Sequence, residues 1–347
     1  MILGLGQRRA PVVLALVDLV QDIDVLLPVL LRGRAEGAFQ LRVVVSRWLL
    51  RESPRVALLL RRHDLAFRDA RRSEIIAGRA PSLSGVSAVL TASESTAEPH
   101  MAGHALAARA ERLGVGAYTL QHGLENVGLT GMDEERFASG HVFCWFPPER
   151  TSAALAPETK AKLVHVGRPA LHADDAPIDD DLAVFENLHA ERYGEGDRKA
   201  FLARLDATLQ ACPDLRICVR THPAGAWLDA EASRFEGWPN ITFISGSRAR
   251  ADPDGAVQTV VRARRVITTP STVALDAALA GRPTALACDG GELFAPLPVL
   301  SSADDWIDFA RGRIGTDGFE AFARRNVLAG DACERILGRL KADLGAA

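Results

Sequence analysis

The chain has no Cys-x-x-Cys pair, although five cysteines are scattered along its 347 residues. This scatter excludes a zinc ribbon and a disulfide framework, so we expect the cysteines to be small buried residues in a reducing cytosol. The sequence also lacks an apolar run long enough to cross a membrane. Its formal net charge of only −3 excludes a general nucleic-acid binder. Internal repeats and low-complexity tracts are missing as well.

What is present is the composition of a globular protein, with 48% hydrophobic and 24% charged residues. The length favours two domains of ordinary size. Arg8-Arg9 precede an apolar run from Pro11 to Val20, an arrangement that a twin-arginine export signal would share. Asp18 interrupts the run and no small-residue cleavage site follows it. We therefore expect a buried first strand in a cytoplasmic protein.

Strand-like and helix-like segments alternate through the first half of the chain. Val43-Val44-Val45 is typical, because a continuous β-branched run fits a strand that is covered on both faces. The alternation predicts an α/β fold with a doubly wound parallel sheet. The expected strands are Val12–Val17, Gln40–Val45, Ala88–Thr91, Ala117–Leu120 and His141–Trp145, and Ala97–Leu113 is an expected helix.

Prolines and aspartates interrupt this pattern from Pro147 to Asp181, and we interpret that region as the connection to a second α/β series. We predict a Rossmann-like domain over residues 1–160, a second one over 161–320, and a C-terminal helix over 321–347 that returns to the first domain. Two such domains would face a cleft, with the strand ends of both sheets pointing into it. The expected elements of the second series are strands Leu182–Phe185, Ile217–Arg220, Ile241–Ile244, Arg265–Thr268 and Pro283–Ala287 and helices Lys199–Ala211, Ala226–Phe235 and Thr272–Ala280.

Two motifs at strand ends of the second domain suggest a phosphate site. Arg220-Thr221-His222-Pro223 ends one strand in a basic turn, and Thr268-Thr269-Pro270-Ser271-Thr272 ends another in a hydroxyl-rich turn before a helix. Hydroxyls and backbone N–H groups at a helix start form a natural phosphate seat. Arg220 and His222 would add the positive charge. Simple helix capping by Ser271 or Thr272 is the alternative.

Three further polar residues follow strands or lie one turn into a helix. Asp276 is placed to accept hydrogen bonds from ribose hydroxyls, and Asn187 could bind a base or phosphate. Arg168, in Val166-Gly167-Arg168-Pro169, could meet a phosphate or a sugar carboxylate, or could simply be exposed.

In the first domain, a strand runs directly into Gln121-His122-Gly123, which places an imidazole at the expected cleft. Histidine is the side chain best suited to move protons near neutral pH, so His122 is the first candidate for catalysis. Glu94 follows a neighbouring strand and is the second candidate. A loop-bonding role for His122, and a role for the Glu94 segment as the start of a helix, are the alternatives.

These motifs resemble those of the GT-B glycosyltransferases that use CMP-activated acidic sugars. His222-Pro223 and Ser271-Thr272 resemble the His-Pro and Ser-Ser/Thr motifs of bacterial sialyltransferases, in the same order. Gln121-His122-Gly123 is similar to a segment of the capsule and lipopolysaccharide enzymes that transfer Kdo from CMP-Kdo. CDP-glycerol polymerases also have a His-Gly element and a Ser-Ser turn.

The resemblance implies transfer of a 2-keto sugar acid from its CMP ester to a hydroxyl of a glycan or glycolipid, without an obligatory metal or cofactor. It implies that His122 or Glu94 activates the acceptor, while a retaining route would need Glu94 or Glu125 as nucleophile. The acidic motif that carries the base in many sialyltransferases is absent as such, since Asp133-Glu134-Glu135 is followed by Arg136. The identity of the base therefore stays open.

Other activities remain as alternatives. A UDP-GlcNAc 2-epimerase-like isomerase would share the fold, but such enzymes have a Ser-Gly-Gly turn and a Glu where this chain has Ser271-Thr272-Val273 and Asp276. A CDP-glycerol-type glycerophosphotransferase and a binding protein without catalysis are the others. The basic stretch from Arg61 to Arg72 is interpreted as a solvated face, or as a contact for an anionic glycan or for lipid head groups if the protein is peripheral to the cytoplasmic membrane.

Overall fold

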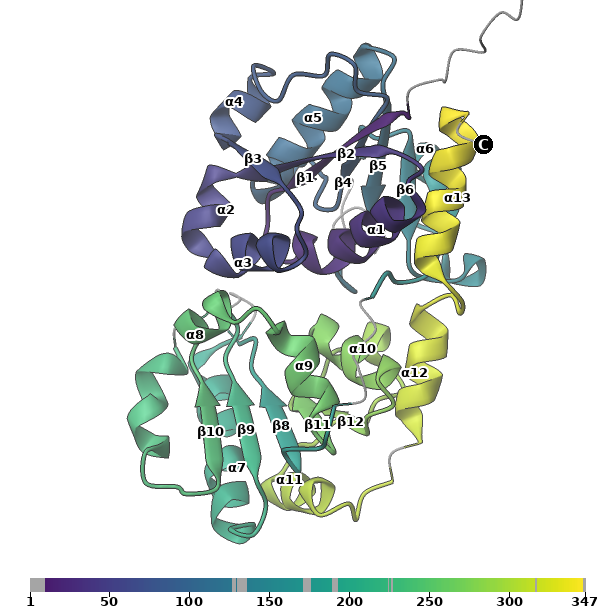
Figure 1. Cartoon of the computed structure of the whole chain (residues 1–347). Coiled ribbons are helices and arrows are strands. Elements are labelled where there is room, and N and C mark those ends of the chain that lie inside the picture. The colour runs from purple at the N-terminus through teal and green to yellow at the C-terminus, as the bar shows by residue number, and fades with distance from the viewer. Residues whose placement is uncertain are drawn as a thin grey trace, which may run out of the picture. The chain divides into compact units, whose positions relative to one another are not determined.

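The computed structural model describes residues 10–126, 129, 136–170, 176–188, 193–223, 225, 227–315 and 317–345. The chain forms two compact units. Unit 1 comprises Met1–Leu171 and Val327–Ala347, and unit 2 comprises His172–Asn326. The units divide after residues 171 and 326, where the sequence predicted divisions after residues 160 and 320. Figure 1 shows the elements of each unit.

Unit 1 is built on a seven-stranded sheet of order β3-β2-β1-β4-β5-β6-β7, and every neighbouring pair is parallel. The strand β1 is buried along its whole length, as expected for an apolar strand covered on both faces. The strands are β1 (Val12–Val17), β2 (Gln40–Ser46), β3 (Phe67–Ala70), β4 (Ala88–Thr91), β5 (Gly116–Leu120), β6 (His141–Cys144) and β7 (Leu163–His165).

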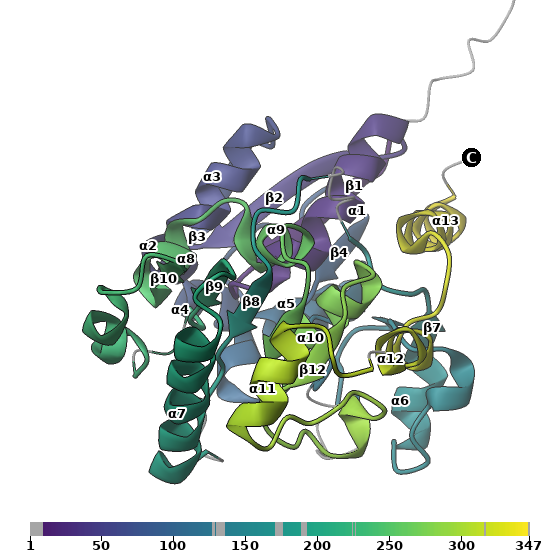
Figure 2. The same cartoon turned by 90° about the horizontal axis from the view of Figure 1, so that it is seen from below.

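Helices cover both faces of this sheet. Apolar residues of α4 and α5 pack with those of β1, β2 and β4 in one core, and α13 packs against α1, as Figures 1 and 2 show. The helices are α1 (Asp22–Glu36), α2 (Arg47–Glu52), α3 (Pro54–Arg62), α4 (Arg72–Ile76), α5 (Met101–Arg112), α6 (Pro157–Lys162) and α13 (Ala332–Leu344), with short 3-10 turns at Glu98–His100 and Pro148–Arg150.

Unit 2 repeats the plan with a five-stranded parallel sheet of order β10-β9-β8-β11-β12. One face carries α7 and α11, packed around Phe201 and Trp306, and the other carries α9 and α10. The elements are β8 (Leu182–Phe185), β9 (Ile217–Arg220), β10 (Ile241–Ile244), β11 (Val266–Thr268), β12 (Thr284–Leu286), α7 (Glu195–Ala211), α8 (Gly246–Ala251), α9 (Gly255–Val261), α10 (Thr272–Leu279), α11 (Ala303–Ala310), α12 (Gly318–Asn326), and 3-10 segments at Asp229–Phe235 and Glu292–Phe294.

The predicted fold class is confirmed: the chain contains two Rossmann-like parallel-sheet units, and its last helix, α13, belongs to the first of them. Two strands were not predicted. Phe67–Ala70 is short and half polar, and Leu163–His165 has only three residues. The segment expected as helix Ala226–Phe235 forms a 3-10 segment over Asp229–Phe235 instead. Within the described part of the chain, no helix has the length and apolar character needed to span a membrane.

Candidate functional site

Each sheet has one place where the strand order reverses, and ligands bind at such points in doubly wound folds. In unit 1 it lies between β1 and β4, which are neighbours although β2 follows β1 in the chain. In unit 2 it lies between β8 and β11. The polar residues that directly follow these strands therefore define one candidate site in each unit.

The imidazole of His122 is held at the carboxyl end of β5. Its Nδ1 lies 3.0 Å from the carbonyl oxygen of Ala92, which can only accept, so Nδ1 carries the proton and Nε2 keeps the lone pair. The ring also meets His100 edge to face, with 5.1 Å between centroids. Burial, and secondarily His100, lower the pKa of His122 to about 4. The side chain is thus neutral at pH 7 and can accept a proton through Nε2.

Glu94, the second catalytic candidate, is buried and fully engaged. Its Oε1 accepts from the backbone N–H groups of Ala138 and Ser139, and its Oε2 accepts from the Ser139 hydroxyl. His104 Nδ1 lies 3.6 Å away. With only 1% exposure, the carboxylate has little room for a substrate, and its contacts anchor the loop before β6. The sequence placed Glu94 at the correct strand end but gave no sign of these partners.

Asp22, which follows the first strand and begins α1, is a buried carboxyl. Its Oδ2 accepts from the N–H groups of Asp18 and Leu19, each at 2.8 Å, and its Oδ1 accepts from the Ser93 hydroxyl. These bonds join the loop after β1 to the loop after β4 across the point of strand reversal. Burial raises the pKa of Asp22 to about 7, against the opposing effect of its hydrogen bonds.

In unit 2, α10 begins without a side-chain cap from the residue before it. Ser271 is the residue before the helix, but its side chain does not cap it. The hydroxyl instead lies 3.2 Å from the hydroxyl of Thr268. The Ser271 side chain therefore does not occupy the N–H groups of the first turn, which begins at Thr272, while the Ala274 N–H donates to the Ser271 carbonyl at 3.1 Å. Asp276 lies further along the same helix, half-buried.

Polar atoms without a hydrogen-bond partner gather next to this helix start. They are Glu186 Oε2, Asn187 Oδ1 and Thr269 Oγ1, all buried. Phe185 and Thr268 are paired in register, so Glu186 and Thr269, which follow them, end adjacent strands. A buried polar atom without a hydrogen-bond partner destabilises the fold unless a ligand or a water molecule supplies the missing hydrogen bond. Asn187 was a sequence candidate, whereas Glu186 and Thr269 were not selected.

Glu186 also ties several loops together. Its Oε1 accepts from the backbone of Leu188 and from the indole N–H of Trp227. Burial raises the pKa of Glu186, while hydrogen bonds from Trp227, Leu188 and the backbone of His222 act in the opposite direction. His222 thus follows β9 as predicted, and its loop is attached to the end of β8 through Glu186. Pro223 follows it, half-buried.

Arg220 does not contribute its charge to the turn at the start of α10. Its guanidinium is 4% exposed and pairs with Asp252 at 2.7 Å, with Thr259 at 3.3 Å from the same nitrogen. Residues alternate between the faces of a strand, and this side chain lies on the face of Cys218. The sequence could not show whether the Arg220 side chain lies toward the start of α10 or on the face of Cys218, because an arginine at a strand end is compatible with both orientations.

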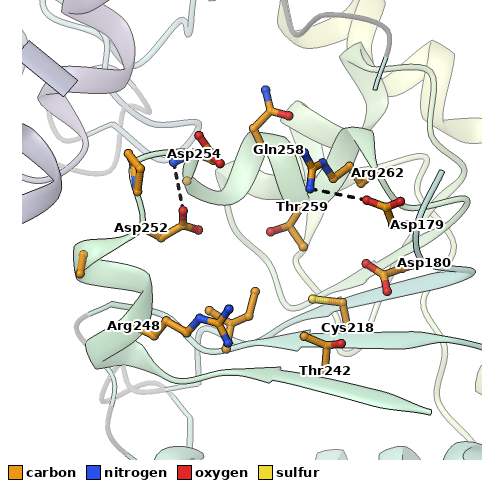
Figure 3. A pocket seen from close by; sticks show the side chains of 14 residues that line it. Asp179, Asp180, Cys218, Thr242, Arg248, Asp252, Asp254, Gln258, Thr259 and Arg262 are labelled. Atoms are coloured by element: carbon orange, nitrogen blue, oxygen red, sulfur yellow. Dashed lines mark hydrogen bonds and ion pairs between the residues drawn. The ribbon is translucent and has the colours of Figure 1, made fainter. Parts of the chain in front are cut away.

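A cavity of about 460 Å³ lies on that face of the second sheet (Figure 3). Its walls come from β9, β10, α8 and α9, and Asp252 and Thr259, the partners of Arg220, belong to them. The remaining lining residues are Asp179, Asp180, Cys218, Thr242, Ile244, Arg248, Ala251, Pro253, Asp254, Gly255, Gln258 and Arg262. None of the residues proposed as the phosphate seat lines it.

Arg168 follows β7 and belongs to unit 1, although the predicted bounds place it in the second domain. Its guanidinium lies over the ring of Trp145, 5.0 Å from the centroid. Glu125 is exposed, and Asp133-Glu134-Glu135 lie outside the described residues. Among the residues that the structure describes, no three His, Cys, Asp or Glu side chains are arranged to hold a metal ion.

No protein-family model and no curated protein sequence matches the chain. Solved structures do match it over nearly its whole length. The S. aureus protein MnaA, solved with UDP, has a TM-score of 0.72 at 15% identity, covering 97% of this chain and 98% of that one. The UDP-GlcNAc 2-epimerase of Neisseria meningitidis, bound to UDP-GlcNAc, has a TM-score of 0.66 at 14% identity, covering 95% and 100%. The wall teichoic acid polymerase TagF, as a histidine variant, has a TM-score of 0.61 at 12% identity, covering 97% and 90%.

These comparisons correct the resemblance drawn from the sequence. The structures that share the fold include UDP-GlcNAc 2-epimerases and a teichoic acid polymerase rather than CMP-sugar sialyltransferases, so the prediction of Kdo or sialic acid transfer from a CMP donor is wrong. The error has a physical cause. His222-Pro223 and Ser271-Thr272 mark strand-end turns, which this fold requires whichever nucleotide it binds, and two-residue motifs do not specify the base.

Proposed function

We propose that the chain is an enzyme that acts on a nucleotide sugar, as a UDP-GlcNAc 2-epimerase-like isomerase. The observation that carries this proposal is the likeness over nearly the whole chain to structures solved with UDP and UDP-GlcNAc. The start of α10, which Ser271 does not cap, supports it, because the N-terminal end of a helix favours phosphate. Glu186, Asn187 and Thr269 supply polar atoms beside that seat.

His122 has the properties of the base that such an isomerase requires. Inversion at C2 breaks the C2–H bond on one face of the sugar and forms a new one on the other, so a base must take up one proton and water or a second acid must deliver another. The electron pair of the broken C2–H bond displaces UDP through cleavage of the C1–O bond, and that bond forms again when the second proton is delivered. Nε2 of His122 is available, because Nδ1 is held by the carbonyl of Ala92. The lowered pKa keeps the ring unprotonated at neutral pH. An anionic substrate beside the ring would raise that pKa and strengthen the base.

The test is incubation of the protein with UDP-GlcNAc in D₂O, followed by proton NMR. We expect the C2 epimer to appear, with deuterium at C2. His122→Ala should lower turnover by about 10²–10⁴-fold, the usual effect of removing a general base. UDP affinity, measured by calorimetry, should stay the same, because the proposed phosphate seat lies on α10.

His63→Ala is the matched control, since His63 ends α3 and takes no part in the proposed site. That variant should keep wild-type turnover. Absence of both epimer and deuterium with the wild-type protein, at substrate concentrations that saturate UDP binding, would show that the isomerase assignment is wrong.

Glycerophosphate transfer from CDP-glycerol is the second candidate. It is favoured by the likeness to the wall teichoic acid polymerase and by the Gln121-His122-Gly123 segment, in which His122 would take the proton from an acceptor hydroxyl. The same protein is incubated with CDP-glycerol and a polyol acceptor, and CMP release is measured. Release that depends on acceptor and on His122, without conversion of UDP-GlcNAc, would select this activity over the isomerase.

A further inference from the structure

A second group of side chains lies at the carboxyl edge of the first sheet, on the β1-β2-β3 side of the strand reversal. Trp48 follows β2, Arg72 follows β3, and Asp18 follows β1 directly. Ligands of doubly wound folds bind at this edge. His122 belongs to the same edge, after β5.

Arg72 is held in one orientation by the other two residues. Its Nε donates to Asp18 Oδ1 at 2.8 Å, and one terminal nitrogen donates to the Asp18 carbonyl at 3.2 Å. The guanidinium carbon lies 3.8 Å from the centroid of the Trp48 ring. The other terminal nitrogen donates to none of the described residues. Asp18 is 3% exposed and Arg72 is 26% exposed, so the pair has a buried side and a side that reaches solvent.

We propose that Arg72, stacked on Trp48 and anchored by Asp18, binds an anionic group of the substrate, a carboxylate or a phosphate. A guanidinium fixed on one side by a carboxylate and on one face by an indole loses little freedom when its outer edge binds an anion. This inference rests on the proposed function and adds the substrate class. The anion would be a carboxylate on the sugar of a nucleotide sugar, or a charged group on an acceptor.

The charge of the surroundings supports an anionic ligand. The segment from Arg47 to Arg79 carries nine arginines and four acidic residues, in a chain with a net charge of −3. Arg47 pairs with Asp69, and Arg71 lies 3.8 Å from Glu74. The segment that contains β3 and Arg72 therefore carries an excess of positive charge, which would attract a negatively charged substrate.

Hydrogen bonds and one covalent link along the backbone connect Arg72 with His122. Arg72 binds Asp18, whose N–H donates to Asp22, and Asp22 accepts from Ser93. Ser93 is next to Ala92, whose carbonyl orients His122. Both groups are thus fixed to the same two strand-end loops, so a substrate bound by Arg72 would be placed against a rigid framework that also carries the base.

The experiment compares ligands that differ only by the anionic group. Affinities are measured for UDP-glucuronate against UDP-glucose, and for glycerol 3-phosphate against glycerol, while UDP alone reports nucleotide binding. In one of the two pairs we expect the anionic member to bind about 10–100-fold more tightly, the range for a hydrogen bond to a charged group. Arg72→Met should abolish that preference and leave UDP affinity unchanged. The pair that shows the preference identifies whether sugar or acceptor carries the charge.

Two further variants keep the test decisive. Arg72→Lys retains a positive charge for buried Asp18, so it should fold even if Arg72→Met does not, but it lacks the outer N–H edge and should lose most of the preference. Arg71→Met, a neighbouring exposed arginine, should change nothing. If neither anionic ligand is preferred, or if the preference is as large in Arg72→Lys as in wild type, the outer edge of the Arg72 guanidinium does not bind the anion and the proposal is wrong. If UDP alone does not bind to the wild-type protein, but the preference for an anionic ligand is present and depends on Arg72, only the nucleotide assignment is wrong.

Discussion

Asp22 shows how one buried side chain couples the proposed site to pH. The carboxyl, at the start of α1, accepts hydrogen bonds from the loops after β1 and β4. Its pKa in the fold is about 7, against an ordinary value of 3.8. Between these values the folded protein retains a proton that the unfolded chain has lost. Stability therefore decreases as pH rises from about 4 to about 7, and Asp22 contributes no further change outside that window.

Asp22→Asn should remove this pH dependence. The amide oxygen can accept both backbone N–H groups, and the amide nitrogen can donate to Ser93, while no charge needs to be buried. As the pH rises from 5 to 8, the unfolding free energy of the variant should increase relative to that of wild type. The expected increase is on the order of 2–4 kcal/mol, at about 1.4 kcal/mol per pKa unit. Urea unfolding at both pH values measures the difference. His122 also makes stability depend on pH, in the opposite direction, because its pKa is lowered from 6.5 to about 4. This contribution is the same in both proteins, so it cancels when their unfolding free energies are compared.

The exposed carboxylate Glu98 provides the control, since Glu98→Gln should show the same stability difference from wild type at both pH values. If the stability difference between Asp22→Asn and wild type is equally large at pH 5 and pH 8, Asp22 titrates normally in the fold.

Strand ends were predictable from the sequence, but the partners of the residues there were not. His122 was found because an apolar strand ends abruptly in Gln-His-Gly. Its tautomer depends on the carbonyl of Ala92, and the anchoring of Glu94 depends on Ser139, both distant in sequence. Such contacts follow from which strands are neighbours. The order β1-β4-β5 is one of several that the same run of strands permits.

At the scale of elements, the continuous apolar strands were located well. Val12–Val17, Ala88–Thr91 and the three strands β8, β9 and β10 have the predicted bounds. The strand β3 was missed because Arg68 and Asp69 occupy half of it, and an edge strand needs little apolar surface. Burial on both faces gives a signal that an edge strand lacks.

The contact of α5 with the end of β4 is especially close. A Cβ on Gly103 would lie 2.4 Å from the carbonyl oxygen of Ser93, which real structures do not tolerate. The loop that carries Ala92, Ser93 and Glu94 is therefore pressed against this helix. Only glycine at position 103 permits the approach, so the placement of the partner of His122 depends on it.

Gly103→Ala should destabilise the protein by about 1–3 kcal/mol, the usual cost of overpacking, because two backbone segments must separate. Gly338→Ala in α13 is the matched control. A Cβ there meets nothing within 4 Å, so this variant should be more stable by about 0.5–1 kcal/mol through the better helix propensity of alanine. Chemical unfolding measures both. Equal effects for the two variants would contradict the close contact between α5 and β4.

At the scale of the whole molecule, the chain leaves unit 1, forms unit 2, and returns to unit 1 with its last helix. α13 packs on α1, and its residue Lys341 forms an ion pair with Glu36. Tyr118 of β5 donates a hydrogen bond to Asp343 at 2.9 Å. The amphipathic pattern of the tail predicted this return, since an isolated apolar face must be covered.

The return makes the stability of unit 1 depend on residues far away in the sequence. Leu337 in α13 is 1% exposed and packs beside Gly33 of α1, so Leu337→Ala should destabilise unit 1 by about 2–5 kcal/mol. Leu209 in α7 is equally buried, in the core of unit 2, so Leu209→Ala should act there. Hydrogen exchange measures each unit separately. We expect faster exchange in β1–β7 for the first variant and in β8–β12 for the second, because each side chain is removed from the core of one unit. If each variant instead accelerates exchange in both sheets to the same extent, the two units unfold as one cooperative body, and α13 stabilises the whole chain rather than unit 1.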